Sequence, residues 1–470
     1  MTNVKSKTSL TRNPPPLNQA TWEKYDKEYS DINQTSWENL KNGLSTPEQF
    51  FTDLNGTLAS FLQSKPEFVK DHKEFFEHNT KSKNPLEEAR KLKIELNKKA
   101  KLPGASEEDK INAKESIRMY SHMLKINKES LEATQAREED KAFRKDFWKT
   151  AKQVTNGTFG EPPSKPTFTK STANQFYKEK YEKPTVINIE DLNWFPSVEP
   201  PTKEYNLSPY TPKDVKNALK KKNNNSAPGY DNIVYEYLLK MPSLHKSLAT
   251  AFTQIRDQGV APDGWGASKV IIIKKKADDP DDIPSNFRMI SLTLNIGKLY
   301  HTLESQRTMQ FMLENSYMDK TAQKAYVEGV HGCVEHVMVV QEIIQQAKLH
   351  KKTVHITWLD LEDAFGSVPH EIIPFIMLHY HIPKCIIAYI TSLYTKLWGK
   401  VCTQDWETDF FQFLKGVFQG DPYSGVIFLV VFNPIIEYIK KYKETHGYTI
   451  KTETAGAQSV ITTPFADDLI

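Results

Sequence analysis

Three aspartates at the ends of short apolar segments constrain this chain more than any other feature of its sequence. Asp360 follows the run 354–359, in which apolar and polar residues alternate, a pattern that predicts a half-buried strand. Asp467 and Asp468 stand in the sequence FADDLI, which suits a tight hairpin. Carboxylates that meet from a strand end and a hairpin can share two divalent cations. The fold must therefore bring together two segments that are distant in sequence.

The composition is that of an ordinary globular chain. With 470 residues it has room for two to four domains and a sizeable core. Hydrophobic residues make up 38% and charged residues 26%, and the net charge is only +3. Any affinity for nucleic acid must therefore come from local basic clusters, because the whole molecule is not a polycation.

Cysteine usage and the N-terminal sequence bear on the compartment. Cys333, Cys385 and Cys402 match neither a zinc spacing nor a disulfide framework, which indicates a reducing environment. The N-terminus MTNVKSKTSL lacks the apolar core of a signal peptide, and no window approaches eighteen apolar residues. We expect a nuclear or cytoplasmic protein that is neither secreted nor bound to a membrane.

The sequence divides into stretches of different character. Residues 1–20 are polar and proline-containing, which predicts a disordered tail. Residues 21–156 have helical periodicity, with a capping box at 46–49, and predict a helical extension. Eight prolines in 157–210 predict an extended connector rather than a core. From 211 onward helices and irregularly spaced short strands mix, so an α+β fold is expected rather than a βαβ array.

Two basic segments could hold phosphate. The apolar strand 269–273 ends in Lys274, Lys275 and Lys276, and Arg288 follows in a second short segment, 286–292. Arginine contacts two phosphate oxygens at once and lysine supplies a point charge, so together they suit a triphosphate. The alternative is a solvated basic strand end.

Two glycine turns complete the series of motifs. In GVFQGDPYSG, at 416–425, two glycines flank Gln419 and permit close approach of a flat ligand. The alternative is a loop that ends where a helix starts at Asp421-Pro422. In SAPGYD, at 226–231, Pro-Gly predicts a fixed turn, with a structural role as the alternative.

Taken in order, these motifs resemble the reverse transcriptase domain of non-LTR (LINE-like) retrotransposons. The resemblance extends from about Trp194 to Ile470. The family motifs APG-x-D, RPISL, QKGF, G-x-x-QGDPLSP and ADD are matched by SAPGYD, 288–292, 323–326, 416–425 and 466–468. Four positions depart from the family pattern without removing a carboxylate, and they indicate a divergent branch or an old copy that is losing constraint: Met289, Gly366, Tyr423 and Gly425.

The resemblance implies a catalytic centre of three aspartates. Asp360 and Asp467, with the backbone carbonyl of Leu361, would ligate two Mg²⁺ ions, or alternatively Mn²⁺. Asp468 would assist as a partial ligand or by supporting the other two. The implied reaction extends a DNA 3′-hydroxyl on an RNA template.

The resemblance also implies a nucleotide site. Lys275 and Arg288 would bind the triphosphate, while Gln419 and Gly420 would shape the pocket for nucleotide and template. Phe365 would lie under the sugar and exclude a 2′-hydroxyl, although a core aromatic is the alternative for this residue alone. The implied partners are an RNA template, a DNA primer or target, and deoxynucleoside triphosphates.

The implied architecture is a right-hand polymerase without a thumb. Residues 211–350 would form fingers and part of the palm, and 351–470 an antiparallel palm sheet backed by helices. Because the last palm strand has barely begun at Ile470, we expect this polypeptide to be inactive, or nearly so, alone.

Three alternatives stay open at this point. An RNA-dependent RNA polymerase would share the palm but carry a polar residue where Phe365 stands. A group II intron maturase would share the carboxylates. A decayed or domesticated fragment would bind nucleic acid without catalysis.

Overall fold

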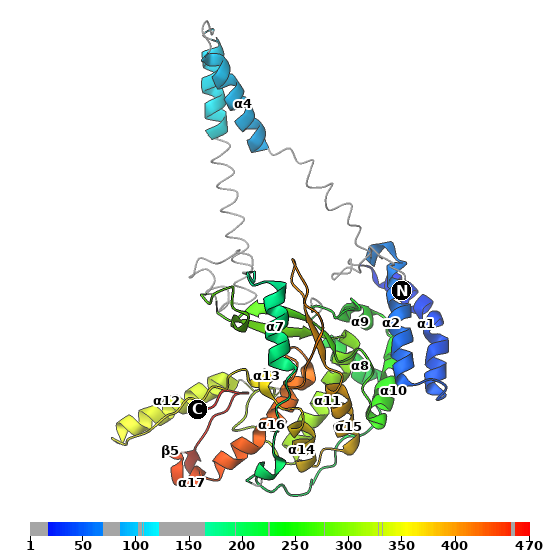
Figure 1. Ribbon diagram of the computed structural model, residues 1–470, viewed down its shortest axis with the longest axis vertical. Coiled ribbons are helices and arrows are strands. Elements are labelled where there is room, and N and C mark those ends of the chain that lie inside the picture. Colours follow the sequence, from blue (N-terminus) through cyan, green and yellow to red (C-terminus); the bar gives the residue numbers. More distant parts are fainter. Residues whose placement is uncertain are drawn as a thin grey trace. The chain divides into compact units, whose positions relative to one another are not determined.

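The computed structural model describes residues 17–68, 85–101, 106, 108–121, 165–192, 194–223, 226–276, 278–327, 329–330, 332–452 and 456–470 (Figure 1). The chain forms two compact units. One comprises residues up to 70 and from 166 onward, and the other comprises 71–165. Most of the predicted tail over 1–20 lies outside the described residues, and Gln19 already begins the first helix.

The unit formed by 71–165 is helical where it is described. It contains α4 (Pro85–Ala100) and a helix over 108–121, and Lys93 Nζ lies 4.5 Å from the ring of Tyr120 between them. Ser106 caps the second helix, because its hydroxyl accepts a hydrogen bond from Asp109 N at 3.1 Å. Ser106 thus precedes the first turn of this helix as its cap.

Two N-terminal helices belong to the larger unit. In α1 (Gln19–Lys41), the side chain of Asn18 accepts from Thr21 N, and in α2 (Pro47–Gln63), Thr46 accepts from Gln49 N. Phe51 packs against Phe252 of α10 (Ser243–Gln258), with ring centroids 6.0 Å apart. The segment predicted as one helical extension, 21–156, is therefore divided between the two units, because the aromatic faces of α1 and α2 bury against α10.

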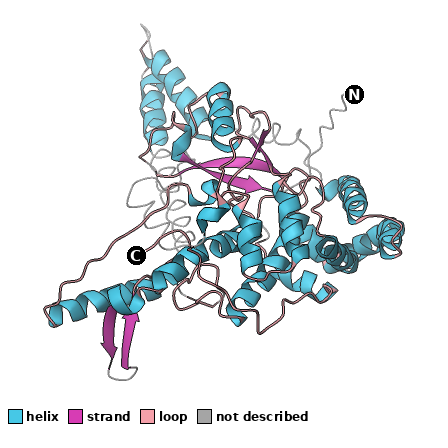
Figure 2. Cartoon of the chain, turned by 60° about the horizontal axis from the view of Figure 1, so that its bottom comes forward, coloured by secondary structure: helices cyan, strands magenta, loops and turns pink. Residues whose placement is uncertain are grey.

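A four-stranded mixed sheet carries the predicted basic strand (Figure 2). Its order is β2 (Phe287–Leu292), β1 (Ala267–Lys274), β3 (Trp398–Val401) and β4 (Phe411–Gln412). β1 pairs antiparallel with β2 and parallel with β3, and β3 pairs antiparallel with β4. The strand predicted over 269–273 is confirmed as part of β1, and the basic segment 286–292 forms β2.

Helices pack around this sheet and form the core. Before β1 these are α8 (Pro212–Lys220), α9 (Tyr235–Lys240) and α10, and after β2 they are α11 (Asn295–Glu314), α12 (Gly332–Leu349), α13 (Ala364–Ser367), α14 (Ile372–His379), α15 (Lys384–Tyr394), α16 (Pro422–Lys440) and α17 (Lys443–His446). A hairpin of β5 (Tyr448–Thr452) and β6 (Gly456–Val460) follows. The mixed α and β content agrees with the predicted α+β class.

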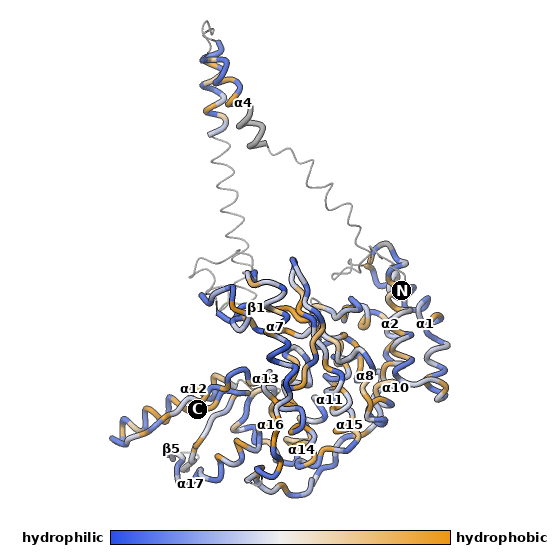
Figure 3. The backbone as a smooth tube through the Cα atoms, in the orientation of Figure 1, coloured by the Kyte–Doolittle hydropathy of each residue, from blue (hydrophilic) through white to orange (hydrophobic). Residues whose placement is uncertain are grey.

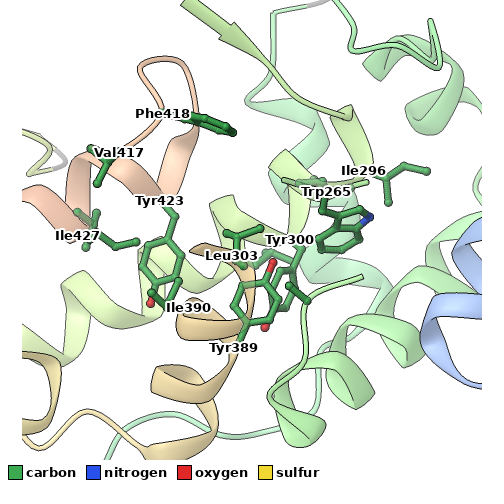
Figure 4. Packing of buried hydrophobic residues seen from close by; sticks show 14 of the residues in the cluster. Trp265, Ile296, Tyr300, Leu303, Tyr389, Ile390, Val417, Phe418, Tyr423 and Ile427 are labelled. Carbon is green, nitrogen blue, oxygen red and sulfur yellow. The ribbon is translucent and has the colours of Figure 1, made fainter. Parts of the chain in front are cut away.

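The centre of the core lies between α11, α15 and α16. Hydrophobic residues recur along these helices (Figure 3), and many of them are buried in the core. Tyr300, Tyr389 and Tyr423 meet there beside Trp265 (Figure 4). Among the described helices, α16 alone has the length and composition that could span a membrane, and 67% of that apolar window is buried inside the protein. Its packing therefore accounts for its apolar sequence.

The predicted connector, 157–210, contributes to the core, and the prediction of a coreless segment is wrong for its described residues. It contains α7 (Lys170–Tyr181) and a short 3-10 helix, Ile189–Leu192. Its buried tyrosines are Tyr177, Tyr181, Tyr205 and Tyr210. The prolines keep 196–210 largely without regular structure, but they leave the aromatic side chains free to bury.

The predicted strand over 354–359 does not form. Only Leu359 pairs, in an isolated antiparallel bridge with Leu469, and Trp358 is 66% exposed. The alternation of apolar and polar residues gives the segment an amphipathic face. A strand also needs a neighbouring strand that forms hydrogen bonds with its backbone N–H and C=O groups. The expected antiparallel palm sheet is therefore reduced here to that bridge and the hairpin that contains Leu469.

Candidate active site

The paired aspartates occupy a two-residue hairpin. Phe465 N donates to Asp468 O at 2.9 Å, and Asp468 N donates to Phe465 O at 3.1 Å, so Ala466 and Asp467 form the loop. Ala466 has a φ of +56°, and Asp467 does not share this positive φ. A positive φ at the first loop position alone is typical of a type II′ turn. Asp467 thus stands at the tip of the turn.

Asp360 reaches this turn through the bridge next to it. Leu359 N donates to Leu469 O at 2.9 Å, and Leu469 N donates back to Leu359 O at 3.1 Å. The same antiparallel register sets Asp360 across from Asp468 and Leu361 across from Asp467. The chain thus brings its three predicted catalytic aspartates to one place.

The carboxylates influence one another electrostatically. Burial raises the pKa of Asp467 above its ordinary value, and the nearby charges of Asp468 and Asp360 raise it further. A backbone hydrogen bond and the positive charge of Arg288 act in the opposite direction. Arg288 therefore lies within electrostatic reach of the aspartate cluster.

The donor chemistry of this cluster fits a hard divalent cation, although the ligands are not drawn closely together. Among the described residues, no group of three or more His, Cys, Asp or Glu side chains is close enough to hold a metal ion. Asp360 and Asp468 are exposed, and Asp467 is half-buried. Carboxylate and carbonyl oxygens are the ligands that Mg²⁺ prefers, and a cation would relieve the repulsion that raises the pKa of Asp467.

Gln323 stabilises the turn through hydrogen bonds to its backbone. From the sequence alone, no role is predicted for this side chain beyond its place in the QKGF-like segment. Its Oε1 accepts from Ala466 N at 3.0 Å and from Ala325 N at 3.1 Å. Its Nε2 donates to Ala466 O at 3.3 Å, and the side chain is 1% exposed. Because both polar groups of Ala466 bind Gln323, the unusual backbone of this residue is stabilised.

The start of α12 supports the same hairpin. His336 Nε2 lies 3.0 Å from Pro464 O. A Cβ at Gly332 would lie 2.5 Å from the ring of Phe465, so only glycine permits this contact. The end of the chain lies beside α12 in Figure 1.

Four of the five predicted nucleotide-site residues line one small cavity of about 50 Å³. These residues are Lys275, Arg288, Phe365 and Gln419. The β1–β2 hairpin positions the two cations, since Arg288 pairs with Ile273 and Lys275 N donates to Asn286 O at 2.8 Å. Lys274 instead forms an ion pair with Asp281 at 2.9 Å. Of these two lysines, Lys275 therefore lines the cavity, and its role there stays a prediction.

Phe365 is a half-buried residue of α13. Its ring stacks on that of Phe428, with centroids 4.9 Å apart and planes at 10°. Its carbonyl accepts from Val417 N at 2.7 Å, which connects α13 to the turn before Gln419. One side of the ring is therefore fixed by the core, while its edge borders the cavity.

Gly420 lies next to this cavity rather than in its lining, on the side of β2. Ser291 N donates to Gln419 O at 2.8 Å, which anchors the turn on the strand that carries Arg288. Gly420 has a φ of +114°, and a Cβ there would lie 2.9 Å from Ser291 O. Glycine is therefore required at this position for the turn to approach the strand.

Asp421 follows the turn and caps α16 rather than facing the cavity. Its carboxylate accepts from Tyr423 N at 2.9 Å and lies 2.6 Å from His301 Nδ1 of α11. Burial opposes its ionisation, but the charge and hydrogen bond of His301 hold the pKa of Asp421 below its ordinary value. This pair fixes the glutamine turn to the central helix.

Two departures from the family pattern have a local explanation. A side chain at position 366 would collide with the carboxylate of Asp363, so the glycine that replaces the family aspartate makes room for it. A Cβ at Gly425 would lie 2.5 Å from the ring of Tyr326, so a proline there would not fit against this ring. Both glycines are therefore matched to neighbouring side chains.

Comparison with known proteins agrees with this arrangement. Residues 273–470 match the family described as reverse transcriptase (RNA-dependent DNA polymerase). This segment of the chain is therefore similar to reverse transcriptases. The matched segment begins inside β1, so α7 and the SAPGYD turn lie upstream of the matched residues although they pack in the same unit.

Relatives of the chain come from retrotransposons. A Pol polyprotein of the type-1 retrotransposable element R2 from Nasonia vitripennis is 25% identical over 48% of this chain and 21% of its own length. The R2 protein of Popillia japonica is 26% identical over 52% of this chain and 32% of its own length. The R2DM protein of Drosophila melanogaster is 24% identical over 52% and 22%, respectively. The chain therefore spans between about a fifth and a third of the length of these relatives.

Proposed function

We propose that this chain carries the catalytic centre of an RNA-directed DNA polymerase from a non-LTR retrotransposon. The observation that carries the proposal is the position of Asp467 at a hairpin tip, within electrostatic reach of Asp360 and Arg288. Arg288 also lines the cavity that holds Lys275, Phe365 and Gln419. A carboxylate cluster next to a basic cavity is the arrangement that phosphoryl transfer from a triphosphate requires.

Divalent cations are part of this proposal. Asp360, Asp467 and the carbonyl of Leu361 would hold two Mg²⁺ ions, with Mn²⁺ as a substitute, and Asp468 would assist. When bound, such ions lower the pKa of the attacking hydroxyl and neutralise the leaving pyrophosphate. Gln323 keeps Asp467 at the tip of the turn, because it binds the backbone on the residue before it.

The side chains of the cavity would select and orient the nucleotide. Arg288 and Lys275 would bind the triphosphate oxygens, and Gln419 would contact the base or the template. Phe365 cannot turn away from the sugar, because Phe428 supports its ring from the core. A fixed aromatic ring at this point favours deoxynucleotides, since a 2′-hydroxyl would meet it. It also disfavours a function as an RNA-copying RNA polymerase.

The proposed partners follow from the reaction. They are an RNA template, a DNA primer or target, and deoxynucleoside triphosphates, and we propose a nuclear or cytoplasmic location. Local basic groups rather than net charge would bind the nucleic acids, because the net charge of the chain is +3.

Primer extension on an RNA template tests the proposal. Asp360→Asn should abolish DNA synthesis by the element protein and leave RNA binding nearly unchanged, since the exposed side chain supports no packing. Asp405→Asn, on the exposed loop between β3 and β4, is the matched control and should retain synthesis. Equal loss of synthesis and RNA binding in Asp360→Asn would count against the assignment, and unchanged synthesis would reject it.

A further inference from the structure

Helix α7 forms one wall of the nucleotide cavity, although it lies upstream of the residues that match the family. Phe176, Tyr177, Lys180 and Tyr181 line this wall. Opposite them lie Lys275, Arg288 and Phe365. The proposed nucleotide site thus includes a helix that the motifs of the reverse transcriptase family do not contain.

Several bonds to the sheet fix α7 at this place. Leu414 N donates to Tyr181 O at 2.9 Å, and Gln412 N donates to Glu182 Oε1 at 3.2 Å. The ring of Tyr181 lies 4.6 Å from that of Phe413, centroid to centroid. Because the end of α7 is bound on both its backbone and its side chains, the position of Lys180 is set by the fold.

Lys180 is a third positive group on this cavity. Its Nζ lies 2.7 Å from Asp363 Oδ2, and both side chains are about one-third exposed, at 29% and 34%. A partly exposed ion pair contributes little net free energy because water screens it. A multiply charged anion in the cavity could therefore take the place of the carboxylate at small cost.

Asp363 lines the same cavity and has an uncommon backbone conformation. Its φ is +52°, and Ser367 Oγ donates to its carbonyl at 3.0 Å. The carboxylate passes directly over Gly366, where any Cβ would collide with it. A non-glycine residue at positive φ is strained, and such strain is frequent at ligand sites.

We infer that Lys180 binds the triphosphate of the incoming nucleotide together with Lys275 and Arg288, and that Asp363 occupies Lys180 as an internal anion while the site is empty. The inference rests on the proposed function, since it adds a residue to the same site. Binding of the nucleotide exchanges one ion pair for another. Asp363 thus competes with the substrate, whereas Lys180 binds it.

The two partners of this ion pair should have opposite effects on affinity. Removal of the charge of Lys180 takes away a contact with phosphate, so affinity falls. Removal of the charge of Asp363 frees Lys180 and also removes repulsion of the anion, so affinity rises. If the pair served only to attach α7 to α13, both substitutions would weaken binding and lower the melting temperature alike.

The test measures binding of inorganic tripolyphosphate and of dTTP to the full chain by titration calorimetry at fixed ionic strength. No metal is added for tripolyphosphate, so the aspartate cluster takes no part. We expect about tenfold weaker binding in Lys180→Gln, since a charge-assisted hydrogen bond is lost. Lys180→Arg should bind nearly as the wild type does. Asp363→Asn should bind about threefold more tightly, since an exposed pair is broken.

Lys178→Gln is the matched control on the same helix. Lys178 Nζ lies 3.9 Å from Asp409, and Lys178 is not part of the cavity lining. This variant should bind tripolyphosphate as the wild type does. Melting temperatures of all variants separate loss of a contact from loss of the fold.

Several outcomes would overturn the inference. Wild-type affinity in Lys180→Gln, weaker binding in Asp363→Asn, or no binding of tripolyphosphate to the wild type would each do so. Failure here and failure of the proposed function are distinguishable. Suppose that primer extension requires Asp360 but that Lys180→Gln has the wild-type KM for dTTP. This result would support the polymerase function and reject the proposed role of Lys180.

Discussion

The cavity proposed to bind the nucleotide and the aspartate cluster are built differently, although Arg288 of the cavity lies within electrostatic reach of Asp467. The cavity is framed by β1, β2, α7, α13 and the glutamine turn, which hydrogen bonds connect across long sequence separations. The aspartates lie on two segments that one bridge joins, Leu359 to Leu469, and Trp358 next to it is exposed. The cavity is thus preorganised by the core, whereas the carboxylates depend on few contacts.

This difference predicts which substitutions affect chemistry and which affect binding. Changes at the aspartate cluster should reduce synthesis without loss of fold. Changes at the cavity should alter affinity or selectivity and, where side chains are buried, stability.

The largest effect is expected for Asp467→Asn. Loss of the carboxylate at the hairpin tip should reduce primer extension by roughly three orders of magnitude, since a metal ligand and its charge are removed. Binding of tripolyphosphate should change little, because Asp467 does not line the cavity. Parallel loss of extension and tripolyphosphate binding would show that the two regions are not separate.

Gln323→Ala should have the next largest effect. The backbone N–H and carbonyl of Ala466 would lose their partner, at a cost of about 1–3 kcal/mol for a buried unsatisfied group. The turn should lose its fixed shape, so primer extension should fall by roughly two orders of magnitude. Gln323→Glu keeps the acceptor for Ala466 N but loses the donor, and an activity no higher than that of the alanine variant would argue against this role.

Phe365→Val should change selectivity more than rate. The smaller side chain leaves space at the sugar, so incorporation of ribonucleotides should rise by roughly tenfold or more relative to deoxynucleotides. Competition between dTTP and UTP in primer extension measures this ratio. Phe428→Leu is the informative companion, since it removes only the stacked support of the ring at 4.9 Å. Unchanged sugar discrimination in both variants would show that Phe365 does not select deoxynucleotides.

The smallest effect concerns the stability of the fold around the SAPGYD turn. Burial raises the pKa of Asp231 to about 6, and its Oδ2 has no hydrogen-bond partner. Because the folded-state pKa is above the unfolded value, the folded state gains protons, and stability should fall as pH rises from about 4 through 6. Asp231→Asn should therefore raise the free energy of unfolding by roughly 1–2 kcal/mol at pH 7–8 and by little near pH 4. Denaturant titrations at both pH values measure this, and a pH-independent effect would contradict the cause.

Local signals predicted the framework of the site well. The helix start at Thr46 follows from its capping residue, and the strand 269–273 follows from its apolar run. The motif residues Lys275, Arg288, Phe365 and Gln419 meet in one cavity because glycines at 416 and 420 let the turn approach α13 and β2. Helix capping and apolar runs depend on only a few neighbouring residues, so they can be recognised in the sequence alone.

Long-range packing explains what the sequence did not predict. The run 354–359 alternates as a strand does, but whether it pairs depends on a partner far away in sequence. The sequence does not show what Gln323 binds, because only the fold brings the backbone of Ala466 next to it. Lys180 belongs to a proline-rich stretch that predicts a connector, and only the burial of Tyr177 and Tyr181 brings it to the cavity.

Because α7 lines the cavity, the cavity must form in a certain order while the ribosome translates the chain. The ribosome releases Lys170–Tyr181 long before β4, and Glu182 and Gln412, which join the two elements, are 230 residues apart. The tyrosine face of α7 must therefore stay exposed in the nascent chain while the intervening segments are made, a period in which apolar surface invites misassociation. The cavity can be completed only late, when β4 emerges and covers that face.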